Sequence, residues 1–176
     1  MENYKNYFAL FSLPIAFDID LPELNSRFRE LQKAAHPDKY ANAIDQERLK
    51  SVQRASLINN AYNTLKDPVN RARHMLEING FDLENEKQNT LAPAFLMQQI
   101  ELREQIEEAH GDIESLDETN DQIVDLLRKT TDSIRQLFAQ DPPGFDEIRE
   151  KVQEAKFFVR LKENVDSIIL DLENND

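Results

Sequence analysis

One short stretch of this sequence brings together residue types that could do chemistry: His36-Pro37-Asp38-Lys39 places an imidazole, a carboxylate and an ammonium group side by side. A histidine beside a carboxylate can belong to a hydrolytic site. However, the chain contains no cysteine, and no plausible activated serine or glycine-rich phosphate loop lies near the stretch. The other two histidines, His74 and His110, are far away in sequence, so a histidine-based metal site is only weakly supported.

The same stretch also has a purely structural interpretation. Proline cannot donate the helical hydrogen bond and pushes the residue before it out of the α region, so Pro37 predicts a helix end near His36. Asp38 would then be no more than a capping residue. The stretch by itself does not decide between a helix stop and a deliberately presented pair of side chains, so the elements around it must be considered.

The composition favours an all-α protein with no metal or other cofactor. The chain has 176 residues, only three glycines and no tryptophan, and it is rich in good helix formers. The lack of cysteine excludes disulfides, cysteine-ligated zinc or iron–sulfur clusters, and a thiol nucleophile. No segment approaches the ~18 apolar residues of a membrane span, and the N-terminus shows no cleavable signal. We therefore expect a mature cytoplasmic protein that does not contact a membrane.

Charge divides the chain into two parts. Residues 1–80 contain 11 Lys+Arg and 10 Asp+Glu, whereas residues 81–176 contain 10 and 24, which accounts for the net charge of -13. This asymmetry predicts two modules with different partners. The acidic second half argues against nucleic acid as a partner, because affinity for nucleic acid comes mainly from phosphate contacts.

Proline and glycine positions predict seven helices, at about 4–12, 20–36, 46–66, 68–79, 92–110, 118–140 and 145–174. We place a linker at 77–91, between an N-terminal four-helix domain at 1–76 and an antiparallel three-helix bundle at 92–176. Apolar spacing predicts the buried seams of the second and third helices. The expected inward residues are Leu21, Leu24, Phe28, Leu31 and Ala35 in the second helix, and Val52, Ala55, Ile58, Tyr62 and Leu65 in the third.

Two further motifs stand in a fixed order after the His-Pro-Asp tripeptide. Ala61-Tyr62-x-x-Leu65 ends the third helix, and Asp67-Pro68-x-x-Arg71 follows it. With the tripeptide at its distance from the preceding helix, this set resembles a J-domain over residues 1–76. Ala35 and His74 depart from the tyrosines that are common at these positions of J-domains.

The J-domain resemblance implies a co-chaperone that stimulates ATP hydrolysis by an Hsp70-type chaperone. It also implies which residues meet the chaperone: His36, Pro37, Asp38 and Lys39 at the turn, and Arg27, Arg29 and Lys33 on the helix before it. Cationic side chains of this kind would give fast, weak and salt-sensitive association with an acidic surface. Without the neighbouring turn, Arg29 and Lys33 would be better explained as an ordinary solvated helix face.

The first helix of the expected bundle has two apolar faces. At about 100° per residue, one face is a core stripe of Phe95, Leu102, Ile106, Ala109 and Ile113. The largely opposite face contains Leu96, Met97 and Ile100, with Glu101, Glu104 and Glu108 beside it. The second face could be buried by another bundle helix or by the first domain. Alternatively, it is an exposed patch for a partner with a basic rim, in which methionine supplies an adaptable contact.

The last helix contains the adjacent pair Phe157 and Phe158. Neighbouring residues of a helix lie about 100° apart, so the two rings cannot both point straight into one core. One of the two rings is expected to join the second apolar face of the expected helix at 92–110. Periodicity does not indicate which ring this is.

The segment Phe95-Leu96-Met97-x-Gln99-x-Glu101-Leu102-Arg103-Glu104, following a J-domain and Gly80-Phe81-Asp82-Leu83, is similar to the HscB family of bacterial iron–sulfur cluster assembly over the whole chain. The resemblance implies an HscA-like Hsp70 chaperone and the scaffold protein IscU as partners. It implies that the scaffold is bound by Leu96, Met97, Ile100, Glu101, Glu104, Glu108 and Phe157, although Ile100 stands where leucine is common. It also implies no enzymatic activity of the chain's own and a bacterial cytoplasm.

Two alternatives to this interpretation stay open at the level of the sequence. One is a general J-protein whose bundle binds other clients or only dimerises. A dimer interface must be self-complementary, and a row of three acids facing its own copy is unfavourable, so we expect a monomer. The other alternative is an enzyme that uses His36 and Asp38.

Overall fold

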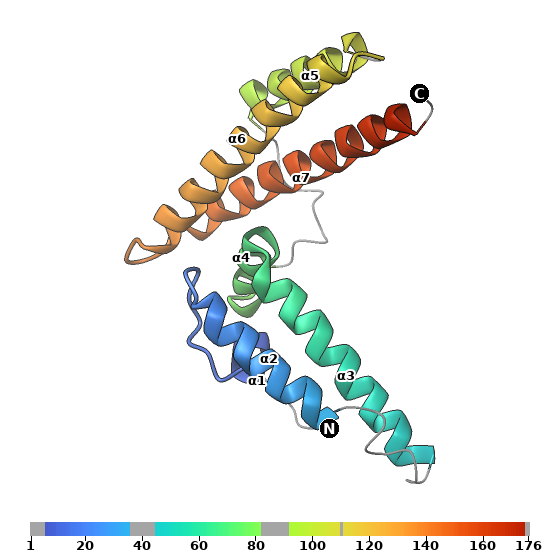
Figure 1. Ribbon diagram of the computed structural model, residues 1–176. Helices are drawn as coiled ribbons and strands as arrows, with labels where there is room; N and C mark the ends of the chain where they lie inside the picture. Colours follow the sequence, from blue (N-terminus) through green and yellow to red (C-terminus); the bar gives the residue numbers. More distant parts are fainter. Residues whose placement is uncertain (1–5, 36–44, 82–91, 110, 175–176) are drawn as a thin grey trace. The chain divides into compact units, whose positions relative to one another are not determined.

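The computed structural model describes residues 6–35, 45–81, 92–109 and 111–174, and within these ranges the chain forms seven α-helices and no strand (Figure 1). The all-α prediction is therefore confirmed. The chain divides into two compact units, Met1–Phe81 and Asp82–Asp176. The first unit contains α1 (Tyr7–Leu10), α2 (Leu21–Ala35), α3 (Asp45–Lys66) and α4 (Pro68–Ile78), and the second contains α5 (Pro93–Glu108), α6 (Ile113–Phe138) and α7 (Phe145–Glu173).

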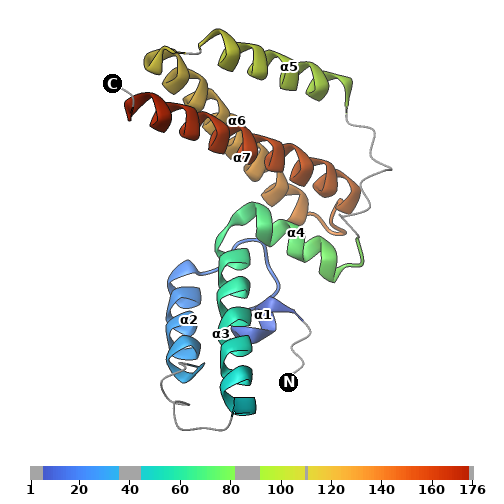
Figure 2. The ribbon, with the colours of Figure 1, turned by 90° about the vertical axis from the view of Figure 1, so that its right-hand side faces the viewer.

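In the first unit, α2 and α3 lie side by side, and α1 and α4 pack against α3 (Figures 1 and 2). Apolar side chains from all four helices and from the loop after α1 are buried between them. The wholly buried large residues are Phe8, Phe11, Leu24, Ile58, Leu65 and Leu76. The core of this unit therefore fixes the orientation of α2, the helix that leads to His36.

Most of the predicted seam of α2 and α3 is confirmed, but Leu21 and Val52 are exposed. Leu21 is the first residue of α2, and no neighbouring element covers it there. Val52 lies about 120° from the buried Ile58 around α3, whereas Ser51 lies within about 20° of it. Ser51 takes the buried position, and its hydroxyl donates to the carbonyl of Arg48 at 2.8 Å.

Asp67 and Gly80 set the ends of α4, as the sequence predicts. The Asp67 carboxylate accepts a hydrogen bond from the amide of Asn70 at 2.7 Å, which caps the helix N-terminus. At the other end Gly80 has a φ of 85°, and the amides of Gly80 and Phe81 donate to the carbonyls of Glu77 and Leu76 at 3.1 Å each. α4 runs to Ile78, and the first compact unit extends to Phe81.

In the second unit, α6 and α7 pack along their length and α5 joins them (Figures 1 and 2). Their shared core consists of Phe95, Leu102, Ile106, Ala109, Leu116, Ile123, Phe158, Leu161 and Val165. The predicted stripe of α5 is thus buried from Phe95 to Ala109. Ile113 does not continue it, because the chain turns at Gly111, whose φ is 93°, and Ile113 becomes the first residue of α6. α6 therefore starts five residues before the predicted position 118.

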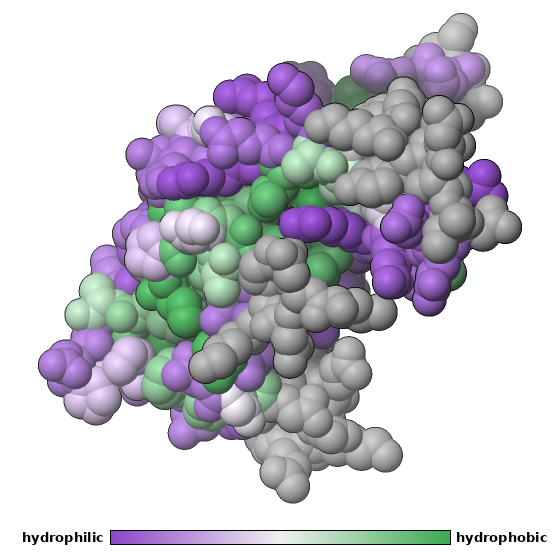
Figure 3. All heavy atoms as spheres, turned by 90° about the horizontal axis from the view of Figure 1, so that it is seen from below, coloured by the Kyte–Doolittle hydropathy of each residue, from purple (hydrophilic) through white to green (hydrophobic). Residues whose placement is uncertain are grey.

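Both polar and apolar side chains are exposed on the described surface. In the face drawn in Figure 3, hydrophilic residues make up much of the periphery. None of the described helices is long and apolar enough to cross a membrane.

Candidate protein-binding sites

The His36–Lys39 stretch lies outside the described residues, but the helix that leads to it is well defined. The described part of α2 runs to Ala35, and the predicted helix stop at Pro37 lies outside the described residues. The Asp20 side chain accepts from the amide of Glu23 at 2.9 Å and caps the first turn of α2. Ala35, at the end of α2, is buried, so the last turn before His36 is anchored in the core.

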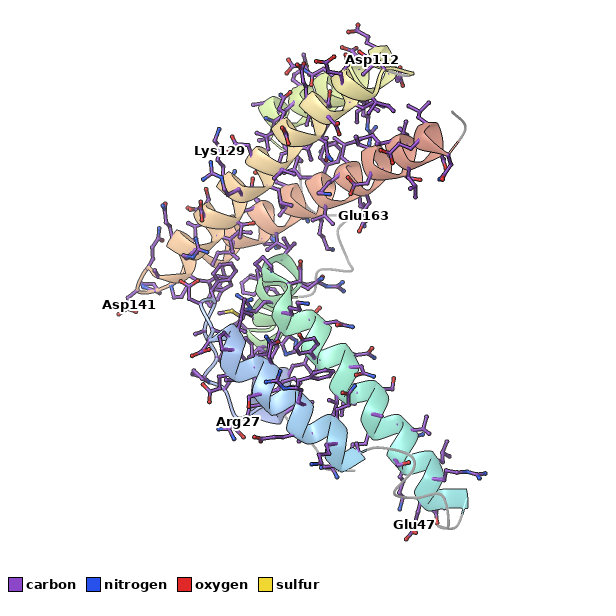
Figure 4. The ribbon with its side chains drawn as sticks, viewed as in Figure 1. Arg27, Glu47, Asp112, Lys129, Asp141 and Glu163 are labelled. Carbon is purple, nitrogen blue, oxygen red and sulfur yellow. The ribbon has the colours of Figure 1, made fainter. Side chains whose placement is uncertain are left out.

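The three predicted basic residues of α2 are exposed, as expected. Arg27, Arg29 and Lys33 all project into solvent, and Figure 4 shows Arg27 on the side of α2 away from α3. Arg27 forms one exposed ion pair with Glu23 at 3.5 Å, a kind of pair that contributes little to stability. These cations are therefore available to a partner at little cost to the fold.

Tyr62 of the Ala61-Tyr62-x-x-Leu65 motif holds α2 against α3. Its ring stacks on Phe28 of α2 with the centroids 4.0 Å apart, and its hydroxyl donates to the Asn25 side chain at 2.8 Å. The Lys66 ammonium lies 5.7 Å from the same ring. Since these contacts lie on the inner face of α2, they orient its outer, basic face.

Arg71 of the Asp67-Pro68-x-x-Arg71 motif is a buried structural residue. Its Nε donates to the carbonyl of Leu65 at 2.7 Å and its Nη2 to the carbonyl of Lys66 at 3.2 Å. Both are C-terminal carbonyls of α3 that lack an intrahelical partner. Its Nη1 donates to the carbonyl of Phe17, in the loop before α2. From the sequence, Arg71 was identified only as part of the motif. Its hydrogen bonds to these three backbone carbonyls were not predicted.

His74 replaces the tyrosine of many J-domains with a different set of contacts. Its ring stacks on Tyr7 with the centroids 4.4 Å apart, and the Tyr7 amide donates to Nε2 at 3.1 Å. Nδ1 lies 3.4 Å from the Glu77 carboxylate. Burial lowers the pKa of His74, and Glu77 only partly opposes this effect. The neutral imidazole thus ties α1 to α4.

The second apolar face of α5 is exposed within the described structure. Leu96 is 44% exposed, Met97 57% and Ile100 50%. Glu101, Glu104 and Glu108 beside them are exposed as well, and none of the three carboxylates forms an ion pair with another described residue. We call the six residues the α5 patch. Neither α6 nor α7 covers it, so the bundle-internal explanation for this face does not hold.

The two adjacent phenylalanines of α7 divide their roles. Phe158 is buried in the core, whereas Phe157 is only partly buried at its edge. The Phe157 ring packs edge-to-face on Phe95 with the centroids 5.6 Å apart, and the Arg103 guanidinium lies 5.6 Å from its centroid. The contact between Arg103 and Phe157 was not predicted from the sequence. The position of Arg103 on α5, four residues after Gln99, gives no signal that it would meet this ring.

The fold defines a class of protein: a J-type helical unit joined in one chain to a second helical unit that presents an apolar, acid-edged patch. Residues 91–166 match the family model described as the HSCB C-terminal oligomerisation domain. The chain is 42% identical over 170 residues to the co-chaperone protein HscB homolog of Shewanella oneidensis, which covers 93% of this chain and 96% of the relative.

Solved structures agree with the sequence comparison. Chaperone HscB from Vibrio cholerae superposes with a TM-score of 0.81 at 35% identity and covers 95% of this chain and 99% of that chain. The crystal structure of human co-chaperone protein HscB superposes with a TM-score of 0.86 at 25% identity. It covers 94% of this chain and 83% of that chain. The chain belongs to the HscB family. It is a co-chaperone that stimulates an Hsp70-type ATPase and binds the scaffold IscU in iron–sulfur cluster assembly.

Proposed function

We propose that this chain works as a two-site adaptor, with a separate surface for each partner. The first unit engages the Hsp70-type chaperone through the turn at His36–Lys39 and the basic face of α2, formed by Arg27, Arg29 and Lys33. The second unit binds the scaffold IscU through the α5 patch and Phe157. Joining the two sites in one chain raises the effective concentration of scaffold at the chaperone.

The observation that carries the scaffold site is the exposure of Leu96, Met97 and Ile100 on the face of α5 opposite its core stripe. Large apolar side chains gathered on one exposed face mark an interaction surface. Met97 can adapt its shape to a partner. The carboxylates beside it, which form no ion pair with another described residue, favour a partner with a basic rim. Phe157 of α7 is included in the proposed site because its ring is only partly buried and contacts Phe95 and Arg103 of the same helix α5.

The chaperone site is supported by the way α2 is held. The inner face of α2 is fixed by the Phe28–Tyr62 stack, and Arg27, Arg29 and Lys33 are exposed on the helix. A well-anchored basic helix that leads to His36 would present the imidazole and the carboxylate of Asp38 at a reproducible angle. Contacts of this type are weak and fall with ionic strength.

We further propose a cytoplasmic monomer with no catalytic activity of its own. The three acids of the α5 patch would face their own copies in a symmetric dimer, which is unfavourable. The description of the matched family model names oligomerisation instead, so light scattering at low and at high salt is a necessary measurement. Turnover of nucleotide by the purified chain alone would contradict the non-enzymatic proposal.

The scaffold site is tested by calorimetric titration of the chain with IscU, repeated with Met97→Ala. We expect binding with a negative heat-capacity change, and a loss of about 1–2 kcal/mol in the variant, as for a buried interface anchor. Leu170→Ala is the matched control, because Leu170 of α7 is also exposed and apolar but lies outside the α5 patch. Equal losses in the two variants would contradict the proposed site.

The chaperone site is tested by His36→Gln. The variant should retain its helical circular dichroism and its affinity for the scaffold while losing stimulation of the chaperone's ATPase. A large loss of helix content would instead favour the explanation of His36-Pro37-Asp38 as a helix stop. Simultaneous loss of both partner activities would contradict the division into two sites.

A further inference from the structure

A groove of about 470 Å³ runs between the N-terminal halves of α5 and α7, next to the α5 patch. Phe95 and Met97 contribute apolar lining, and Ala92 and Ala94 leave room beside them. Met97 and Glu101 belong both to the patch and to the groove, so the two surfaces are continuous. A partner that covers Met97 therefore also reaches the mouth of the groove.

The α7 side of the groove carries an ion pair, Lys151–Glu154. The Lys151 ammonium donates to both oxygens of the Glu154 carboxylate, at 2.9 and 2.7 Å. The Lys151 side chain is 39% exposed and that of Glu154 17%. Glu101 lies across from them without an ion pair among the described residues. The charged lining thus consists of two carboxylates and one ammonium group.

We propose that this groove extends the scaffold-binding surface and receives a lysine or arginine side chain of the scaffold. The aliphatic stem of such a side chain would lie against Phe95 and Met97. Its charged end would meet Glu101 and compete with Lys151 for Glu154. Lys151 would then act as a specificity residue, because its charge opposes the incoming cation and limits the affinity for it. This inference rests on the proposed scaffold site.

The charge arithmetic predicts opposite effects for the two members of the ion pair. Lys151→Gln leaves two carboxylates without a competing cation, so binding of a basic side chain should tighten. Glu154→Gln leaves one carboxylate and a released ammonium group, so binding should weaken. Both substitutions break the same ion pair, and any effect of simply loosening α7 would therefore have the same sign in both variants.

The experiment is calorimetric titration of IscU with the wild type, Lys151→Gln and Glu154→Gln at low and high salt. We expect about two- to fivefold tighter binding for the first variant and about two- to fivefold weaker binding for the second, as single charges at a partly exposed site give. Both differences should shrink at high salt. The matched control is Lys162→Gln, since Lys162 of α7 is 37% exposed and pairs with Asp166 outside the groove.

Each other outcome overturns the inference. Two variants that behave like Lys162→Gln would show that the groove is not contacted. Effects of reversed sign would show that it receives a carboxylate, and equal weakening would show that the ion pair only supports the fold. Absence of binding by the wild type would instead refute the proposed scaffold site itself. Wild-type binding that is sensitive to Met97→Ala but not to the groove variants would refute the groove alone.

Discussion

Some single residues in this protein are polar but buried within the fold, and others are apolar but exposed at its surface. Arg71 is charged but buried, and its donors serve backbone carbonyls of α3 and of the loop before α2. Met97 is apolar but exposed. Each runs against the usual tendency of its residue type. For Arg71 the reason is hydrogen bonding within the unit, and for Met97 it is the proposed contact with a partner.

His74 gives the first unit a predicted sensitivity to acid. Its pKa is lowered in the folded state by burial, whereas the unfolded chain binds the proton near the ordinary value of 6.5. The stabilising contribution of the neutral ring is therefore fully present above pH 6.5 and is lost as the pH falls through the folded-state pKa. Protonation would also remove the acceptor for the Tyr7 amide at Nε2.

This prediction is checked by urea unfolding of the wild type and of His74→Phe at several pH values between 7.5 and 5. The difference in the free energy of unfolding between the two should change as the pH falls below 6.5, in the direction that costs the wild type stability. The comparison with His74→Phe removes effects of pH that are common to both proteins. A difference that stays constant across this range would contradict the assignment.

At the scale of elements, α5 and α3 each have apolar residues on more than one face. On α5, the inner stripe fills the bundle core and the outer face forms the proposed scaffold site. On α3, Ser51, Ile58 and Leu65 face the core while Leu49 and Val52 are exposed on another side. A helix with apolar residues on several sides therefore requires a structure before its inner face can be assigned.

The start of α4 is predicted to depend on the carboxylate of Asp67. Asp67→Ala should destabilise the first unit by about 0.5–2 kcal/mol, because the amide of Asn70 loses its acceptor. Asp67→Asn is the control, since its side-chain oxygen can still accept from that amide. Chemical denaturation followed by circular dichroism measures both. Equal stability of the alanine and asparagine variants would show that the cap contributes nothing.

At the scale of the whole molecule, the division of charge matches the proposed division of function. The first 80 residues are nearly balanced, with 11 Lys+Arg and 10 Asp+Glu, and the remainder has 10 and 24. The exposed cations of α2 belong to the first unit and the acids of the α5 patch to the second. If the proposed sites are correct, each surface would attract a partner of opposite charge and disfavour the other unit's partner.

The adaptor proposal predicts that the length of the connection between the units matters for coupling but not for binding. Insertion of about 20 Gly/Ser residues within 82–91 should leave the scaffold affinity unchanged. The scaffold concentration needed for half-maximal stimulation of the chaperone should rise about three- to fivefold, because effective concentration falls with linker length. Steady-state ATPase titrations measure this shift. An unchanged midpoint would indicate that the two sites act independently.

Much of the fold was accessible from local signals in the sequence. Asp67-Pro68 and Gly80 specify the ends of α4 through capping and a positive φ, which are short-range effects. The stripe from Phe95 to Ala109 follows from helical periodicity. The same reasoning failed at Leu21, Val52 and Ile113, where burial depends on a neighbouring element or on where the chain turns. His36–Lys39 lies outside the described residues, so its assignment still rests on the sequence.

By itself the sequence determined the all-α class, the order of the helices, the two-part charge distribution and the family resemblance, because these depend on residue type and spacing along one chain. Only the tertiary structure decided which side of α5 remains open, which of Phe157 and Phe158 enters the core, and that Lys151 and Glu154 lie beside Met97. These facts depend on how α5 packs on α6 and α7. Packing is a property of side chains from distant segments, and no local pattern contains it.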